Sequence, residues 1–116
     1  MHAAARAGWP IQSTRDNGRG VVYISDHVLR SALARELRRR FVCQPTRIAF
    51  TLDGTVLRAV DIDVTGSYGA QLRELGDEIR RAVFDTLREF IGDTGHHGSP
   101  IDVTITDIVE GDPLNP

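Results

Sequence analysis

The sequence predicts an α+β fold, a two-layer sandwich in which two helices pack on one face of a small mixed three-stranded sheet. Apolar residues recur at helical spacing in two stretches, near residues 25–41 and 72–91. Between them, two segments of alternating polarity flank Asp53-Gly54, a pair typical of hairpin turns. A last alternating segment begins at Ile101. The predicted order is helix, strand, strand, helix, strand, and Val21–Ile24 could add a short strand before it.

Composition limits the classes of protein to consider. The chain has 116 residues, 41% of them hydrophobic and 26% charged, and a formal net charge of −2. This size favours one soluble domain, and the balanced charge counts against a dedicated nucleic-acid binder. The single cysteine, Cys43, excludes an intrachain disulfide. Without a membrane-length apolar run or a secretory signal, the chain is expected to be cytoplasmic.

The expected boundaries leave a short tail at each end. Residues 1–19 contain few large apolar groups and several turn-forming residues, so they are predicted to form a flexible N-terminal tail. Residues 20–110 are predicted to form the single α+β domain, and residues 111–116 a C-terminal tail.

The first helix should begin after Ser25, a good N-cap, with Asp26 near the positive end of the helix dipole. Pro45 sets the limit at which it must have ended. Its predicted apolar stripe consists of Val28, Leu29, Ala32, Leu33, Leu37 and Phe41.

The hairpin turn must keep the apolar residues of both strands on one face. A two-residue loop of Asp53-Gly54 would turn Asp61 and Asp63 toward the core. A three-residue loop, 52–54, keeps them outside and gives Gly54 the left-handed position, so this loop is predicted. It places Arg58 on the core side of its strand.

The second helix is predicted from an apolar stripe and a C-cap at Gly92. Gly76 lies within it and costs about 1 kcal/mol relative to alanine, which we interpret as a sign of close packing against the sheet or the other helix. A right-handed crossover makes the strands on either side of this helix parallel. The stripe comprises Leu72, Leu75, Ile79, Val83, Leu87 and Phe90 or Ile91.

Carboxylates and histidines provide the first candidate sites. Asp61 and Asp63 share a strand face, and Asp102 would join them if the last strand lies alongside. Three carboxylates could bind a divalent cation or form an acid–base pair, but a solvated sheet face is favoured. His96-His97, with Asp93, could likewise ligate a metal, although a polar loop is the preferred interpretation.

Two further segments could contact a partner. Gly66-Ser67-Tyr68-Gly69 has the spelling of the KH-domain loop that clamps nucleic acid, although a helix-entry turn also explains it. The patch formed by Arg35, Arg38, Arg39 and Arg40 could contact phosphate, an anionic membrane surface or an acidic partner, or simply be a solvated helix end. Arginines beside Cys43 could lower its pKa, whereas burial would make it a packed thiol.

Three motifs in order resemble the alkaline-shock family of bacterial envelope stress-response proteins. They are the segment 20–28, the segment 60–64 with Tyr68-Gly69 after it, and the closing strand 101–105 with Asp107-Ile108 after it. The resemblance spans about residues 20–108. The Gly-Val that the family usually has after the first helix is replaced here by the segment 41–45, as in a divergent member.

The resemblance implies a small, cytoplasmic, non-enzymatic protein of cell-envelope homeostasis. Such proteins self-associate or are held at the inner face of the membrane by a membrane-anchored partner. We therefore expect an interaction or scaffold protein, with no catalytic residue, cofactor or metal. The expected interaction surface is Arg35, Arg38, Arg39, Arg40, Asp61, Asp63 and Asp102. The alternatives are a KH-like nucleic-acid-binding module and a small carboxylate-based metal-binding protein or enzyme.

Overall fold

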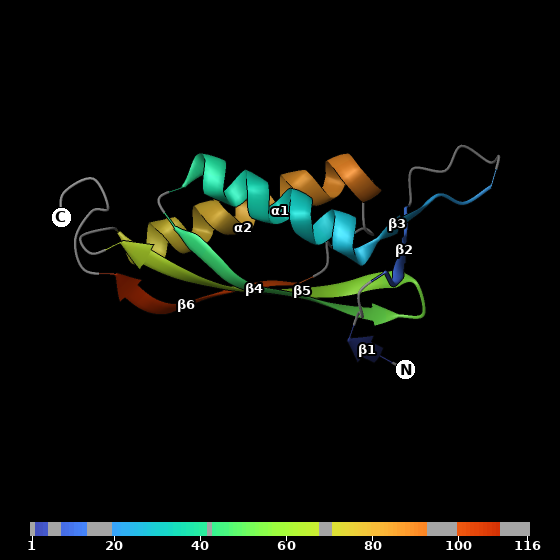
Figure 1. Ribbon diagram of the computed structural model, residues 1–116, viewed down its shortest axis with the longest axis horizontal. Coiled ribbons are helices and arrows are strands. Elements are labelled where there is room, and N and C mark those ends of the chain that lie inside the picture. The colour runs from blue at the N-terminus through green and yellow to red at the C-terminus, as the bar shows by residue number, and fades with distance from the viewer. Residues whose placement is uncertain are drawn as a thin grey trace.

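A computed structural model describes residues 2–4, 8–13, 20–41, 43–67, 71–92 and 100–109 of the chain. Figure 1 shows two helices lying side by side above a twisted sheet. The elements are β1 (His2–Ala4), β2 (Pro10–Gln12), β3 (Tyr23–Ser25), α1 (Asp26–Arg40), β4 (Gln44–Asp53), β5 (Val56–Ser67), α2 (Leu72–Ile91) and β6 (Ile101–Val109).

The predicted α+β fold class is confirmed. The main sheet has the order β1-β4-β5-β6, in which β4 and β5 form an antiparallel hairpin and β5 and β6 are parallel, as the crossover rule predicts. The three predicted strands are thus joined by β1, which pairs antiparallel with β4. Strands β2 and β3 form a separate two-stranded sheet. Both helices cover the same face of the main sheet (Figure 1).

The hydrophobic core lies between the helices and the sheet. Its side chains alternate along β4 and β5 and follow one stripe on each helix, as the periodicity predicts. The core consists of Ile11; Leu29, Leu33 and Leu37; Ile48, Phe50 and Leu52; Leu57, Val60, Ile62 and Val64; and Ile79, Ala82, Val83, Leu87 and Ile91.

The segment 9–13 belongs to the folded unit, as β1 does, so the prediction of a flexible tail is wrong for both. Ile11 is fully buried, and Trp9 packs against the core. The backbone N–H of Trp9 donates to Oδ1 of Asp26 at 2.8 Å, and the N–H of Asp26 donates to the carbonyl of Trp9 at 2.8 Å. The indole N–H of Trp9 donates to the carbonyl of Gly54 at 3.3 Å. Two apolar residues are enough to anchor this segment because the hairpin and α1 supply polar partners.

The start of α1 is fixed by its cap and by a buried ion pair. Ser25 caps the helix as predicted, its hydroxyl accepting from the N–H of His27 at 3.1 Å. Asp26 is fully buried, and its Oδ2 lies 2.9 Å from Nη2 of Arg30. Nε of Arg30 donates to the carbonyl of Ile48 at 3.0 Å, which ties α1 to β4. Val28, predicted to be in the apolar stripe, is instead 49% exposed.

The predicted three-residue hairpin loop is wrong. Asp53 pairs with Val56 and Leu52 with Leu57, so the turn has two residues, and Gly54 adopts a φ of +63° within it. A β-bulge follows, because Thr51 pairs with Ala59 and leaves Arg58 as the extra residue. Because the bulge adds one residue to β5, the apolar residues of both strands again lie on the same face of the sheet, toward the core. Arg58 is therefore exposed rather than on the core side.

Helix α2 follows its predicted stripe and ends at Gly92, which has a φ of +79°. The interpretation of Gly76 is wrong: a Cβ built on it meets no heavy atom within 4 Å beyond its own helix backbone and sequence neighbours. Within the described parts of the chain, neither helix has the length and apolar character needed to cross a membrane.

Candidate interaction surface

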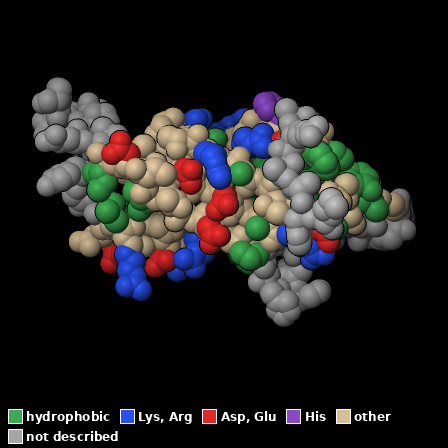
Figure 2. Space-filling model, turned by 90° about the horizontal axis from the view of Figure 1, so that it is seen from below, with side chains coloured by type: hydrophobic (Ala, Val, Ile, Leu, Met, Phe, Trp, Pro, Cys, Tyr) green, Lys and Arg blue, Asp and Glu red, His purple; other side chains and the backbone are tan. Residues whose placement is uncertain are grey.

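An acidic cluster lies on the outward face of the sheet, away from the helices. Asp61 of β5 is in direct register with Asp102 of β6, and both side chains are exposed. Asp63 lies two residues further along the same face, where its Oδ2 is 3.8 Å from Nε of Arg47. The structure thus brings together the three carboxylates singled out in the sequence. Figure 2 shows acidic and basic side chains gathered near the middle of this face.

The acidic cluster is electrostatically unbalanced within one chain. Like charges directly opposite on neighbouring strands destabilise a sheet, and Asp61 and Asp102 have no ion pair among the described residues. In the described part of the chain, no group of three or more His, Cys, Asp or Glu side chains could hold a metal ion. Arg47 compensates Asp63 alone, so Asp61 and Asp102 form the part of this surface where an added cation would reduce repulsion.

A basic patch occupies the end of α1, in the opposite layer of the molecule. Of its four arginines, Arg39 and Arg40 contact Glu36 at 2.6 and 2.7 Å. The hydrogen bond from Arg39 lowers the pKa of the Glu36 carboxyl, and the same contact raises the pKa of Arg39. Arg35 and Arg38 are exposed and make no ion pair with any described residue. Helix α1 carries five arginines against two acidic residues, so its surface is cationic.

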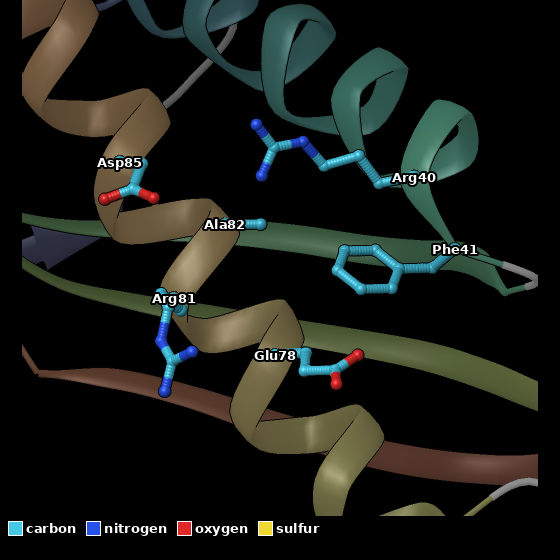
Figure 3. A pocket seen from close by; sticks show the side chains of 6 residues that line it. All are labelled: Arg40, Phe41, Glu78, Arg81, Ala82 and Asp85. Carbon is cyan, nitrogen blue, oxygen red and sulfur yellow. The ribbon is translucent and has the colours of Figure 1, made fainter.

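A groove separates the end of α1 from the middle of α2. It has a volume of about 340 Å³ and is lined by Arg40, Phe41, Glu78, Arg81, Ala82 and Asp85. In Figure 3, Arg40 extends from α1 toward Asp85, while Phe41 and Ala82 point toward each other across the gap. The groove combines charges of both signs with a small apolar floor.

Sequence reasoning did not find this groove. The signal was present on α2, where Glu78, Arg81, Ala82 and Asp85 recur at spacings of three and four residues and therefore share one side of the helix. Which element would face that side could not be read from the spacing. Only the packing of α1 beside α2 brings Arg40 and Phe41 to it.

The structure shows the surroundings of Cys43 and of Gly66. Burial raises the pKa of the Cys43 thiol, so the neighbouring arginines do not activate it. Gly66 is buried inside β5, in register with Ile108, rather than in a loop between two helices as in a KH domain. Tyr68 and Gly69 lie outside the described residues, as do the proposed ligands Asp93 and His96-His97 and the predicted tail 111–116.

Comparisons with known proteins give no relative. No model of a known protein family, no curated protein and no solved structure matches this chain.

Proposed function

We propose that the protein is a non-enzymatic interaction or scaffold protein that self-associates through two oppositely charged surfaces. One is the acidic cluster of Asp61, Asp63 and Asp102, and the other is the basic patch of Arg35, Arg38, Arg39 and Arg40. The observation that carries the proposal is the register of Asp61 with Asp102, two exposed carboxylates that make no ion pair with a described residue. The resemblance to the alkaline-shock family suggests a role in cell-envelope homeostasis, near a membrane-anchored partner.

The placement of the two surfaces favours contact between copies. The acidic cluster is on the sheet layer and the basic patch on the helix layer, so the two cannot meet within one chain. A second copy can bring Arg35 and Arg38 to Asp61 and Asp102. Such a contact joins two different surfaces, and unless a rotation closes the assembly into a ring, it repeats into an open chain. That geometry suits a scaffold.

The proposal predicts association that depends on protein concentration and on salt. Sedimentation velocity of the full chain at low ionic strength should show the mean mass rising with concentration. Added salt should reverse this, because exposed charges more than about 10 Å apart are screened at about 0.1 M salt. A particle that stays monomeric at every concentration in low salt would overturn the proposal.

Charge reversal should identify the surfaces. The double variant Arg35→Glu/Arg38→Glu is expected to remain monomeric where the wild type associates. The matched control, Arg73→Glu/Arg88→Glu, makes the same change in net charge on α2 and should associate like the wild type. Equal loss in both variants would show that net charge, not the basic patch, governs association.

A further inference from the structure

The main sheet ends in an open edge at β6. This nine-residue strand pairs with β5 on one side, and no described strand pairs with its other side. An unpaired edge presents backbone N–H and C=O groups that can bind another strand. Toward its end the strand is irregular, because the pairing skips Thr106 and the N–H of Ile108 donates to Oδ1 of Asp107 at 2.8 Å. The regular part of the edge is therefore 101–105. The described residues of β6 contain no proline, and its β-branched residues favour extended structure.

The apolar side chains of β6 are incompletely covered. Ile101, Val103 and Ile105 are half-buried, and Ile108 is 41% exposed. Their counterparts on β5, such as Val60, are almost fully buried. Helix α2 packs on the face of β6 that points to the helix layer, but no described strand lies beside its outer edge. The strand therefore keeps an apolar strip that one more strand would cover.

Gly76 lies on the flank of α2 that borders this strip. At about 100° per residue, Gly76 is almost opposite Glu78 and Asp85, which face α1 across the groove. It therefore faces away from α1, on the side of β6. Near it, the side chains of Leu72, Leu75 and Ile105 surround Gly66, since a Cβ on Gly66 would lie 3.6 to 3.7 Å from each of them. No described residue fills the space beside Gly76, and a partner that approaches closely would account for a glycine there.

The outward side of this edge is acidic. Asp102 and Asp107 lie on β6, with Asp61 one strand further in, and none of the three makes an ion pair among the described residues. We propose that β6 accepts an extended segment of a partner protein in which apolar residues alternate with Arg or Lys. Its apolar residues cover the strip beside Gly76, and its cations face Asp102 and Asp61.

Charge favours this partner over a second copy of the chain at the same edge. Pairing β6 with another β6 would bring a second Asp102 and a second Asp107 to an acidic seam, and like charges across neighbouring strands repel. A basic strand removes that repulsion instead of doubling it. The site shares Asp61 and Asp102 with the proposed self-association surface, so a basic strand and a second copy compete for these carboxylates. Only self-association needs the basic patch, and removing that patch separates the two proposals.

The test uses a capped peptide of about ten residues that alternates valine and arginine. It is titrated at low salt into the isotope-labelled full chain carrying Arg35→Glu/Arg38→Glu, which keeps the β6 edge and removes the proposed self-association. Amide shifts are expected along residues 101–109 and near Gly76. A valine–glutamate peptide should bind at least tenfold more weakly. So should a valine–arginine peptide with alternate backbone amides methylated, because it cannot form the ladder. Equal binding of the methylated peptide would overturn strand addition in favour of adhesion to the acidic face.

Two variants locate the site. Gly76→Leu puts a side chain in the space beside residue 76 and should lower the affinity for the valine–arginine peptide at least tenfold. Its melting temperature should stay at or above that of the wild type. Asp102→Arg should reverse the preference to the valine–glutamate peptide. Arg38→Glu, which removes part of the basic patch, should not weaken peptide binding even where it abolishes self-association. Unchanged binding in folded Gly76→Leu, or a concentration-dependent dimer that Gly76→Leu abolishes, would overturn the proposal.

Discussion

The two edges of the main sheet differ in how the described residues cover them. On the β4 side, β1 adds to the edge, and the segment 9–13 closes the hairpin end through Ile11 and Trp9. On the β6 side, no described strand is added and the apolar residues remain partly exposed. The chain thus uses N-terminal residues to cover the β4 side, whereas no described segment covers the β6 side. The covered side should carry stability, and the open side should carry interaction.

The largest expected effect tests this difference with two matched truncations. Ile11→Ala should lower the free energy of unfolding by about 3 kcal/mol, because it leaves a cavity under a fully buried side chain. Ile108→Ala, on the open side, should cost less than about 1 kcal/mol. Urea denaturation followed by Trp9 fluorescence measures both. Similar losses for the two variants would contradict the proposed division of roles.

A second prediction concerns the ion pair that holds the covered side to α1. Asp26→Ala should cost about 3 kcal/mol, because it removes a buried carboxylate that both pairs with the partly exposed Arg30 and accepts from the Trp9 N–H, leaving that donor without its acceptor. Asp26→Asn, which can still accept from Trp9, should cost less. Equilibrium unfolding of both variants checks the order. If the asparagine variant loses as much as the alanine variant, the Trp9 hydrogen bond contributes nothing measurable.

Much of this fold could be predicted from the sequence, because local patterns specify it. The stripe Leu29, Leu33 and Leu37, the cap at Ser25 and the parallel β5–β6 pair all follow from spacing and handedness. Likewise, the common face of Asp61 and Asp63 needed only the period of a strand.

Other features depend on contacts between distant segments. The bulge at Arg58 and the three-residue loop solve the same parity problem, so alternation could not choose between them. The burial of Ile11 requires the hairpin end and the start of α1 as partners. The sequence also could not show which side of α2 Gly76 faces, so its open space became visible only in the structure.

A smaller change in stability is expected at Gly76, on the β6 side of the molecule. Gly76→Ala should raise the free energy of unfolding by about 0.8 kcal/mol, because alanine is the better helix former and its methyl group meets no neighbour. Thermal unfolding at fixed pH measures this. A destabilised variant would show that the space at Gly76 is filled within the chain.

The smallest effects are pH-dependent. The lowered pKa of Glu36 means that its contacts with Arg39 and Arg40 persist at pH values where an ordinary glutamate is half protonated. Their contribution to stability is present above the unfolded pKa and is lost as the pH falls through the lowered folded pKa. An NMR titration of the Glu36 carboxyl should give a midpoint below that of the Arg39→Gln/Arg40→Gln variant. Equal midpoints would contradict the described contacts.

The raised pKa of Cys43 gives a matching prediction at the alkaline end. Its thiol should react with iodoacetamide more slowly than a free cysteine at neutral pH, because less thiolate is present. The rate should approach the free value in denaturant. A native rate faster than that of free cysteine would show that the arginines of the basic patch do activate the thiol.

The central claim is that the acidic cluster and the basic patch bind each other between copies, and mixing two charge-reversed chains tests it most directly. Arg35→Glu/Arg38→Glu and Asp61→Arg/Asp102→Arg should each sediment as monomers at low salt, since each presents like charges on both surfaces. Mixed together, they should associate, because each acidic surface then meets a basic one. If both remain monomeric in the mixture while the wild type associates, these two surfaces are not the contact.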